Sequence, residues 1–182
     1  MSRELSEMSL AELWELFPII LTEHRECWTE WFEEERMLLR KLLPDGTVIT
    51  HVGSTAVRWI KAKPIIDILV ELPFGADLER VKEELTRNGY ICMSETRSRA
   101  SFNKGYTENG YAERVFHIHV RDCGDNSEIA FCRYLNEHRD AAEAYEQLKL
   151  RLKESCGGDR DAYTAAKGEF VRAILSKAAA QK

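Results

Sequence analysis

The spacing of hydrophobic positions changes along the chain, which predicts a mixture of helices and strands. Apolar residues recur at helical intervals over residues 10–17 and again over about 28–43. Ser9 is placed to cap the first of these helices, and a glutamate three residues later completes a capping box. Pro18 ends this helix, and residues 19–21 read as a short strand or an extended arm. Two helices are therefore expected before the main sheet.

Short β-branched and apolar runs in the middle of the chain predict the strands of a small sheet. The clearest is residues 65–72, a near-continuous apolar run that is typical of a buried strand. A turn at residues 108–110 separates the last two runs, so these are expected to form an antiparallel pair. An amphipathic helix over residues 77–88, closed by Gly89, lies between the second strand and the third. The predicted strands cover residues 47–52, 65–72, 90–93, 101–104 and 112–121.

The last third of the chain is helical in pattern, from about residue 127 to residue 179. Breaks are expected near residues 138–139 and again at 157–158, after which Asp159 can cap the final helix. This change from strand-like runs to helical spacing of the hydrophobic residues predicts a separate helical layer that follows the sheet.

Length and composition agree with a single α+β domain. The chain has 182 residues, of which 44% are hydrophobic and 31% are charged, and a chain of this size can bury a core of its own. We therefore predict one domain over residues 1–182, with a small mixed sheet flanked by helices at about 47–121 and a C-terminal helical layer at about 125–179.

Net charge limits the classes of partner. There are 26 basic and 31 acidic side chains, which gives a formal charge of −5. A broad nucleic-acid surface needs a basic face, so none is expected. A small basic pocket for one nucleotide is still compatible with this charge, because net charge averages over such pockets.

The cysteines and the hydropathy of the chain predict a cytoplasmic protein. Five cysteines are present and no two form a Cys-x-x-Cys pair, so we expect reduced thiols and neither a zinc site nor a disulfide framework. The N-terminus is acidic and unlike a signal peptide, and no apolar stretch is long enough to span a membrane.

The segment Gly53-Ser54-Thr55, at the end of a predicted strand, is the first candidate for chemistry. A glycine there lets the backbone approach a ligand closely because it has no Cβ. Ser54 and Thr55 add hydroxyl groups and begin a turn whose free backbone N–H groups suit an anion. The alternative is a tight strand-to-helix turn that binds nothing.

Asp67 lies inside the predicted buried strand, where an unpaired carboxylate would be costly to desolvate. One explanation is an ion pair with Lys63 or Arg58. The other is a divalent metal ion, since Mg²⁺ is held by one or two carboxylates and by phosphate oxygens of a substrate. The residues alone leave both explanations open.

The segments around Gly53 and Asp67, together with three later runs of the chain, resemble a known family in their order and in their residue types. They are similar to the GrpB family, also called UPF0157, and the resemblance covers roughly residues 14–175. It implies a nucleotidyltransferase-like fold, because GrpB proteins are assigned to that superfamily. In that superfamily a Gly-Ser turn holds the nucleotide phosphates, and a nearby strand supplies carboxylates that bind a metal ion. The runs that carry the resemblance are residues 51–57, 62–68, 116–120, 131–135 and 161–167.

Two departures from the superfamily pattern concern the metal site. The superfamily has two acids separated by one residue, and here the second position is Leu69, while Glu71 lies one pleat further along the strand. A third acid normally comes from a later strand, where this chain has His117 and His119 instead. The resemblance therefore implies one metal ion or none, rather than a two-metal site.

His117 and His119 are two residues apart on a predicted strand, so both project from one face. If the strands pair as expected, that face can look toward Asp67, and two imidazoles with one carboxylate can hold a divalent ion or act as a general base. The alternative is a pair of hydrogen-bonded sheet residues. A histidine-triad site is excluded because the third position is Arg121.

A nucleotide pocket in an acidic protein also needs cations. Lys63 precedes the strand that carries Asp67, and Lys104 lies where a predicted strand meets a loop, so these lysines are our first candidates for phosphate binding. The other basic candidates are Arg114, Arg133, Lys149 and Lys167.

We therefore predict a nucleotidyltransferase that binds a nucleoside triphosphate with Mg²⁺ or Mn²⁺ and acts on an unknown acceptor. One alternative is a catalytically degenerate module that binds a nucleotide or a phosphometabolite. A second alternative is a metal-dependent phosphohydrolase that uses the histidine pair. The predicted residues are Gly53, Ser54, Thr55, Lys63 and Lys104 for the nucleotide, and Asp67, His117 and His119 for the metal ion and catalysis.

Overall fold

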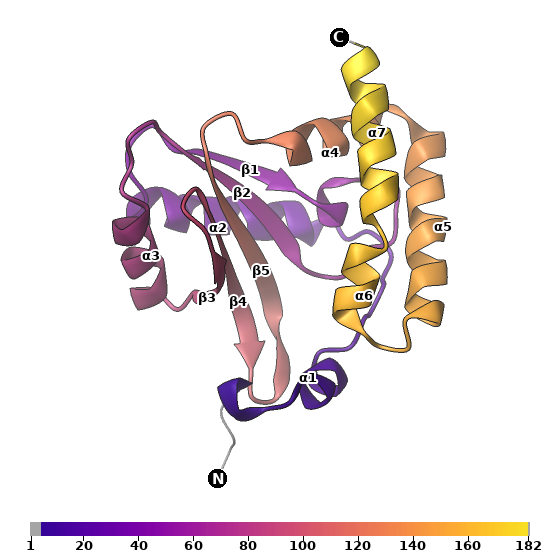
Figure 1. Cartoon of the computed structure of the whole chain (residues 1–182), viewed down its shortest axis with the longest axis horizontal. Coiled ribbons are helices and arrows are strands. Elements are labelled where there is room, and N and C mark those ends of the chain that lie inside the picture. Colours follow the sequence, from indigo (N-terminus) through magenta and orange to yellow (C-terminus); the bar gives the residue numbers. More distant parts are fainter. Residues whose placement is uncertain (1–4, 182) are drawn as a thin grey trace.

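A computed structural model describes residues 5–181, and it shows helices packed on both faces of a five-stranded sheet (Figure 1). The strands are β1 (Val48–Val52), β2 (Ile66–Leu72), β3 (Ile91–Glu95), β4 (Arg99–Thr107) and β5 (Gly110–Asp122). The helices are α1 (Leu10–Leu16), α2 (Cys27–Leu42), α3 (Leu78–Arg87), α4 (Ser127–Glu137), α5 (Arg139–Ser155), α6 (Arg160–Ala165) and α7 (Gly168–Ala180), with short 3₁₀ turns η1 (Leu5–Glu7) and η2 (Ser54–Ala56).

The order of strands across the sheet is β1-β2-β5-β4-β3. Strands β2 and β5 run parallel, whereas the other neighbouring pairs are antiparallel, so the sheet is mixed as predicted. The central parallel pair joins segments about fifty residues apart and sets Asp67 beside His117. The α+β fold class is therefore confirmed, and so is the antiparallel pairing of β4 with β5.

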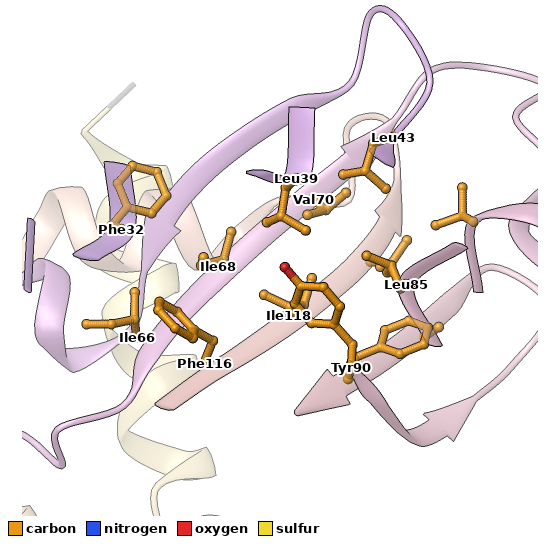
Figure 2. Close-up of a cluster of buried hydrophobic side chains, with 14 of the residues drawn as sticks. Phe32, Leu39, Leu43, Ile66, Ile68, Val70, Leu85, Tyr90, Phe116 and Ile118 are labelled. Atoms are coloured by element: carbon orange, nitrogen blue, oxygen red, sulfur yellow. The ribbon is translucent and has the colours of Figure 1, made fainter. Parts of the chain in front are cut away.

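The alternation of side chains along β2 and β5 creates two apolar layers. Ile68 and Ile118 point to one face, where they pack against α2 and α3, and Figure 2 shows this cluster with Phe32 and Leu39 of α2. Leu69 points to the other face and packs against the C-terminal helices α4, α5 and α7. Residues 67, 117 and 119 share the phase of Leu69, so they lie on the helix-covered side of β2 and β5.

Most predicted boundaries agree with the structure to within a few residues. Ser9 caps α1 in a capping box, as expected. Residues 19–21 form an extended arm rather than a strand, because the one backbone bridge of this segment is an isolated pairing of Thr22 with Ala62. The break between α6 and α7 was not predicted. It places Gly168, a poor helix former, at the start of α7 and Lys167 beside it.

Within residues 5–181, no helix is long and apolar enough to cross a membrane.

Candidate metal and phosphate site

Asp67, His117 and His119 converge on one point of the sheet. Asp67 pairs in register with His117 across the parallel strands β2 and β5, and His119 follows on the same face. The Nδ1 atom of His117 and the Nε2 atom of His119 each lie 3.3 Å from Oδ1 of Asp67. One ligand atom from each residue lies within 4.8 Å of the other two, so the group has the dimensions of a metal site.

The two imidazoles keep the Asp67 carboxyl ionised. Burial by itself would raise its pKa, but the hydrogen bonds from His117 and His119 outweigh that effect and hold the pKa of Asp67 well below its usual range. An ionised carboxylate with two imidazole nitrogens is a donor set that suits Mn²⁺, Zn²⁺ and similar divalent ions, whereas Mg²⁺ prefers oxygen ligands. The residues present therefore fit Mn²⁺ or another transition metal better than Mg²⁺.

No second carboxylate joins this group among the described residues. Leu69, at the position of the superfamily's second acid, is fully buried in the apolar layer under the C-terminal helices. Glu71 is buried as well, and its carboxylate accepts hydrogen bonds from the backbone N–H of Gly124 at 3.0 Å and from the side chain of Asn126 at 2.9 Å. Both donors bind Oε1, so this oxygen is engaged away from Asp67.

Two residues that sequence reasoning missed hold His117 in place. The hydroxyl of Tyr106 lies 2.7 Å from Nε2 of His117, and Arg160 donates a hydrogen bond to the same hydroxyl oxygen at 2.9 Å. Because a guanidinium can only donate, Tyr106 is left to donate its own proton to Nε2 of His117. The Nδ1–H then faces Asp67, and a metal ion would bind there in place of that proton. Such outer partners fix the orientation of a ligand side chain. Nothing in the local sequence signals this role, since Arg160 comes from α6.

The Gly53 turn closes directly over Asp67. Gly53 has φ +73° and ψ −170°, a conformation that is essentially restricted to glycine. A Cβ at this position would lie 2.3 Å from Oδ2 of Asp67. Glycine is thus required both for the backbone conformation and for the close approach of the turn to the carboxylate, and Ser54 next to it lines the same cavity.

Thr55 does not face this cavity, so its predicted role in binding the nucleotide is wrong. Its side chain is buried, its hydroxyl donates to the backbone oxygen of Ile65 at 3.2 Å, and it lies 3.0 Å from Nε2 of His51. The hydroxyl is satisfied within the protein and ties the turn to the segment before β2.

A cavity of about 610 Å³ opens beside Asp67, and one side of it gathers four cations. These are Lys63, Lys149, Arg160 and Lys167. Burial, reinforced by the charges of Lys167 and Arg160, lowers the pKa of Lys63 to about 8. Burial, reinforced by Lys167, likewise lowers the pKa of Lys149 to about 7. Clustered cations that repel one another in this way favour the binding of an anion, which would offset both the burial and the repulsion.

Tyr163, next to Lys63 and Lys167, supplies a further polar group to the cavity. The ammonium groups of Lys63 and Lys167 lie 4.7 Å and 4.6 Å from the centre of the Tyr163 ring. Tyr163 lines the cavity, and its buried hydroxyl has no hydrogen-bond partner among residues 5–181. An unsatisfied buried hydroxyl at the edge of a cation cluster is suited to donate to a ligand oxygen.

Lys104 lies on the opposite face of the sheet, so its predicted position near the phosphates is wrong. It pairs in register with Phe116 rather than with His117. Its ammonium donates to the buried carboxylate of Glu35 at 2.8 Å and sits over the ring of Tyr90. The phase of strand alternation decides this placement, and a shift of one residue would have turned the lysine to the other face.

Replacing Lys149 with methionine is expected to stabilise the fold. Below about pH 7 this lysine is charged in both the folded and the unfolded chain, so the unfavourable burial of its charge acts in full. As the pH rises from about 7 toward 10.5, the folded chain loses the proton first and the destabilisation fades. The unfolding temperature of Lys149→Met should therefore exceed that of the wild type by more at about pH 6 than at about pH 9.

The groups around Lys149 define the control for this experiment. Lys63 and Lys167 oppose its charge, Glu146 favours it, and its ammonium donates to the backbone oxygen of Lys61. Lys153 is exposed near the end of the same helix, so Lys153→Met should leave the unfolding temperature nearly unchanged. Inorganic tripolyphosphate should bind Lys149→Met about tenfold more weakly, or about 1.4 kcal/mol. Equal unfolding temperatures for Lys149→Met and wild type at both pH values would contradict the expectation.

Comparison with known proteins identifies relatives over most of the chain. The GrpB protein family matches residues 18–177. The glutamate-rich protein GrpB of Alkalihalophilus pseudofirmus is 36% identical over 167 residues, which cover 87% of this chain and 95% of that protein. A UPF0157 protein of Pseudomonas aeruginosa is 38% identical over 158 residues, which cover 85% of this chain and 65% of that protein.

Solved structures agree with the sequence relatives. The crystal structure of the GrpB protein from Enterococcus faecalis matches with a TM-score of 0.73 and 32% identity, covering 87% of this chain and 96% of that one. The Cid1 poly(U) polymerase with bound Mg 3'-dATP matches with a TM-score of 0.51 and 13% identity, covering 79% of this chain and 44% of that one, so the two share a nucleotidyltransferase-like fold and no more. On the family match and these relatives, the chain belongs to the GrpB protein family.

Proposed function

We propose that the cavity binds a nucleoside triphosphate together with one divalent metal ion and transfers a nucleotidyl group to an acceptor. The observation that carries the proposal is the composition of the cavity. An ionised carboxylate with two imidazoles lies beside four cationic side chains in one space, on a nucleotidyltransferase-like fold. Triphosphates need both kinds of partner, because their charge must be offset and the reacting phosphate must be polarised.

Each part of the site has a place in this reaction. Asp67 with His117 and His119 would hold the ion, which supplies Lewis-acid polarisation of the phosphate when bound. Lys63, Lys149, Arg160 and Lys167 would offset the charge of the leaving pyrophosphate. An acceptor oxygen forms a bond to the α-phosphorus as the bond to the bridging oxygen breaks. Pyrophosphate leaves with that electron pair, and the acceptor proton passes to water in the open cavity.

A second candidate function is the binding of a nucleotide or a phosphometabolite without nucleotidyl transfer. The buried Leu69 and the engaged Glu71 motivate it, because they leave Asp67 without a second carboxylate. In that case the chain binds a nucleotide or a phosphometabolite as a sensor or adaptor and forms no product. The two candidates differ in whether bound nucleotide is ever converted.

Isothermal titration with ATP, GTP, CTP and UTP, each with Mn²⁺ and with Mg²⁺, tests both candidates. We expect at least one triphosphate to bind, more tightly with Mn²⁺ than with Mg²⁺, because the donor set includes two imidazoles. Pyrophosphate release in the presence of an acceptor library then separates transfer from binding alone. No heat with any nucleotide and either ion, from protein that remains folded by circular dichroism, would refute nucleotidyl transfer and the nucleotide-binding form of the second candidate.

A further inference from the structure

A single row of residues crosses four strands and changes in polarity along its length. Asp67 of β2 pairs with His117 of β5, His117 pairs with Asn103 of β4, and Asn103 pairs with Ile91 of β3. All four side chains line the same cavity. Neighbouring strands are about 4.8 Å apart, so Ile91 lies roughly 14 Å from Asp67 across the sheet. The floor of the cavity thus runs from a carboxylate through an imidazole and an amide to an aliphatic side chain.

Helix α1 lines the half of the cavity that lies over β3 and β4. Leu10, Leu13 and Trp14 of this helix line the cavity, and α1 itself buries none of its residues in the protein. The helix is anchored through Phe17, whose ring packs on Tyr106 and Tyr111 with centroids 4.8 Å and 5.1 Å apart. Figure 1 shows α1 beside the tip of the hairpin of β4 and β5, below α6 in that view.

Charge is divided sharply between the two halves. The charged residues that line the cavity come from β2, from the segment just before it, from β5 and from helices α5, α6 and the start of α7. Among the described residues that line it from α1, β3 and β4, none is charged. Ile91 and Met93 are 43% and 59% exposed, and Leu10 is 60% exposed, so this half presents apolar surface that the described residues leave open.

We infer that this half of the cavity, bounded by Leu10, Leu13, Trp14, Ile91, Met93 and Asn103, binds the acceptor, and that the acceptor is a molecule without anionic groups that has an aliphatic portion and a hydroxyl or amine. The inference rests on the proposed nucleotidyl transfer and names its second substrate. The aliphatic portion lies against Ile91, Met93 and α1. Its polar end reaches back past the Asn103 amide to the α-phosphate near Asp67, where the oxygen or nitrogen displaces pyrophosphate and gives up its proton.

Two other occupants fit this half less well. A nucleic-acid acceptor would bring phosphates over β3 and β4, where no cation among the described lining residues offsets them. A nucleobase would be held by aromatic stacking and by polar groups that read its edges. From α1, β3 and β4 this half offers one indole, one amide and the Tyr106 ring, whose hydroxyl is already hydrogen-bonded with His117 and Arg160, and the remaining side chains are leucine, isoleucine and methionine. The lining therefore favours an aliphatic group, whose burial contributes about 0.8 kcal/mol per methylene.

A methyl-labelled methionine experiment tests the apolar subsite directly. Met93 lines this half and is 59% exposed, while Met37 is 56% exposed on α2 and does not line the cavity. In protein labelled with ¹³C at methionine methyl groups, titration with 1-octanol should shift the Met93 resonance and leave Met37 unchanged. Adenosine at the same concentrations should leave both unchanged. A shift of Met93 by adenosine and not by octanol assigns this half to a nucleobase and overturns the inference.

A pair of edge-strand variants supplies the matched control. Ile91 on β3 and Val48 on β1 are exposed β-branched residues on the two edges of the sheet, and Val48 does not line the cavity. Ile91→Lys should weaken octanol binding about tenfold, since it brings a charge into the apolar wall, whereas Val48→Lys should not change it. Equal octanol affinity in both variants would contradict the assignment.

The results with octanol and with ATP plus Mn²⁺ distinguish a failure of the acceptor-site inference from a failure of the proposed nucleotidyl transfer. Binding of ATP without any octanol-dependent shift overturns the acceptor subsite alone. Octanol binding by folded protein that fails to bind any nucleoside triphosphate overturns the proposed transfer, and the acceptor role with it. Binding of both, followed by nucleotide-dependent modification of an aliphatic alcohol or amine detected by mass spectrometry, supports the inference.

Discussion

Asp67→Asn is expected to abolish Mn²⁺ binding and to lower the rate of nucleotidyl transfer by about 10²–10³-fold. The asparagine side chain has nearly the same shape, but it lacks the negative charge that the two imidazoles now stabilise. An amide oxygen is a weaker ligand for a divalent ion than a carboxylate, and no second carboxylate among the described residues is placed to take its role. Metal affinity by isothermal titration and turnover by pyrophosphate release measure the two effects.

The control for this substitution is Asp45→Asn, in the exposed turn before β1. It makes the same chemical change away from the cavity, so metal binding should be unchanged. The experiment also decides whether the half-buried Asp67 carboxylate holds a metal ion or serves only as a partner of His117 and His119. If Asp67→Asn lowers the unfolding temperature but binds Mn²⁺ as tightly as the wild type, then Asp67 is a structural partner of the histidines and the metal site does not exist.

The parts of this site that lie within one or two neighbouring strands could be predicted from sequence. The convergence of Asp67 with His117 and His119 required only that two apolar strands pair and that side chains alternate. The GrpB resemblance added the nucleotidyltransferase-like fold. Strand period determines the face on which each of these side chains lies, whereas the parallel pairing of β2 with β5, about fifty residues apart, was an assumption of the prediction.

The cationic side of the cavity could not be predicted in the same way. Lys149 and Lys167 were named only among several basic candidates, and Arg160 and Tyr106 were not named at all. Their positions depend on how α5, α6 and α7 pack over the sheet, which is a tertiary property that no local pattern encodes. Lys104 illustrates the converse, since its residue type suited the site and its strand phase placed it on the opposite face.

Gly53→Ala is expected to destabilise the fold strongly and to disrupt the metal site. The new Cβ would lie 2.3 Å from Oδ2 of Asp67, and φ +73° with ψ −170° is a conformation that alanine cannot adopt without strain. We expect a loss of about 3 kcal/mol or more in the free energy of unfolding, together with displacement of the carboxylate and loss of metal affinity. Urea unfolding and Mn²⁺ titration measure these effects.

Gly75→Ala separates the two causes of that loss. Gly75 also has a positive φ, +79°, but a Cβ there would meet nothing within 4 Å, so only backbone strain of about 1 kcal/mol is expected. If the clash with Asp67 is real, Gly53→Ala should also be less harmful when Asp67 is first changed to glycine, because the obstructing side chain is then gone. An unchanged loss in the Asp67→Gly background would mean that the turn does not close over the carboxylate, and the shared cleft on which the proposed function depends would be lost with it.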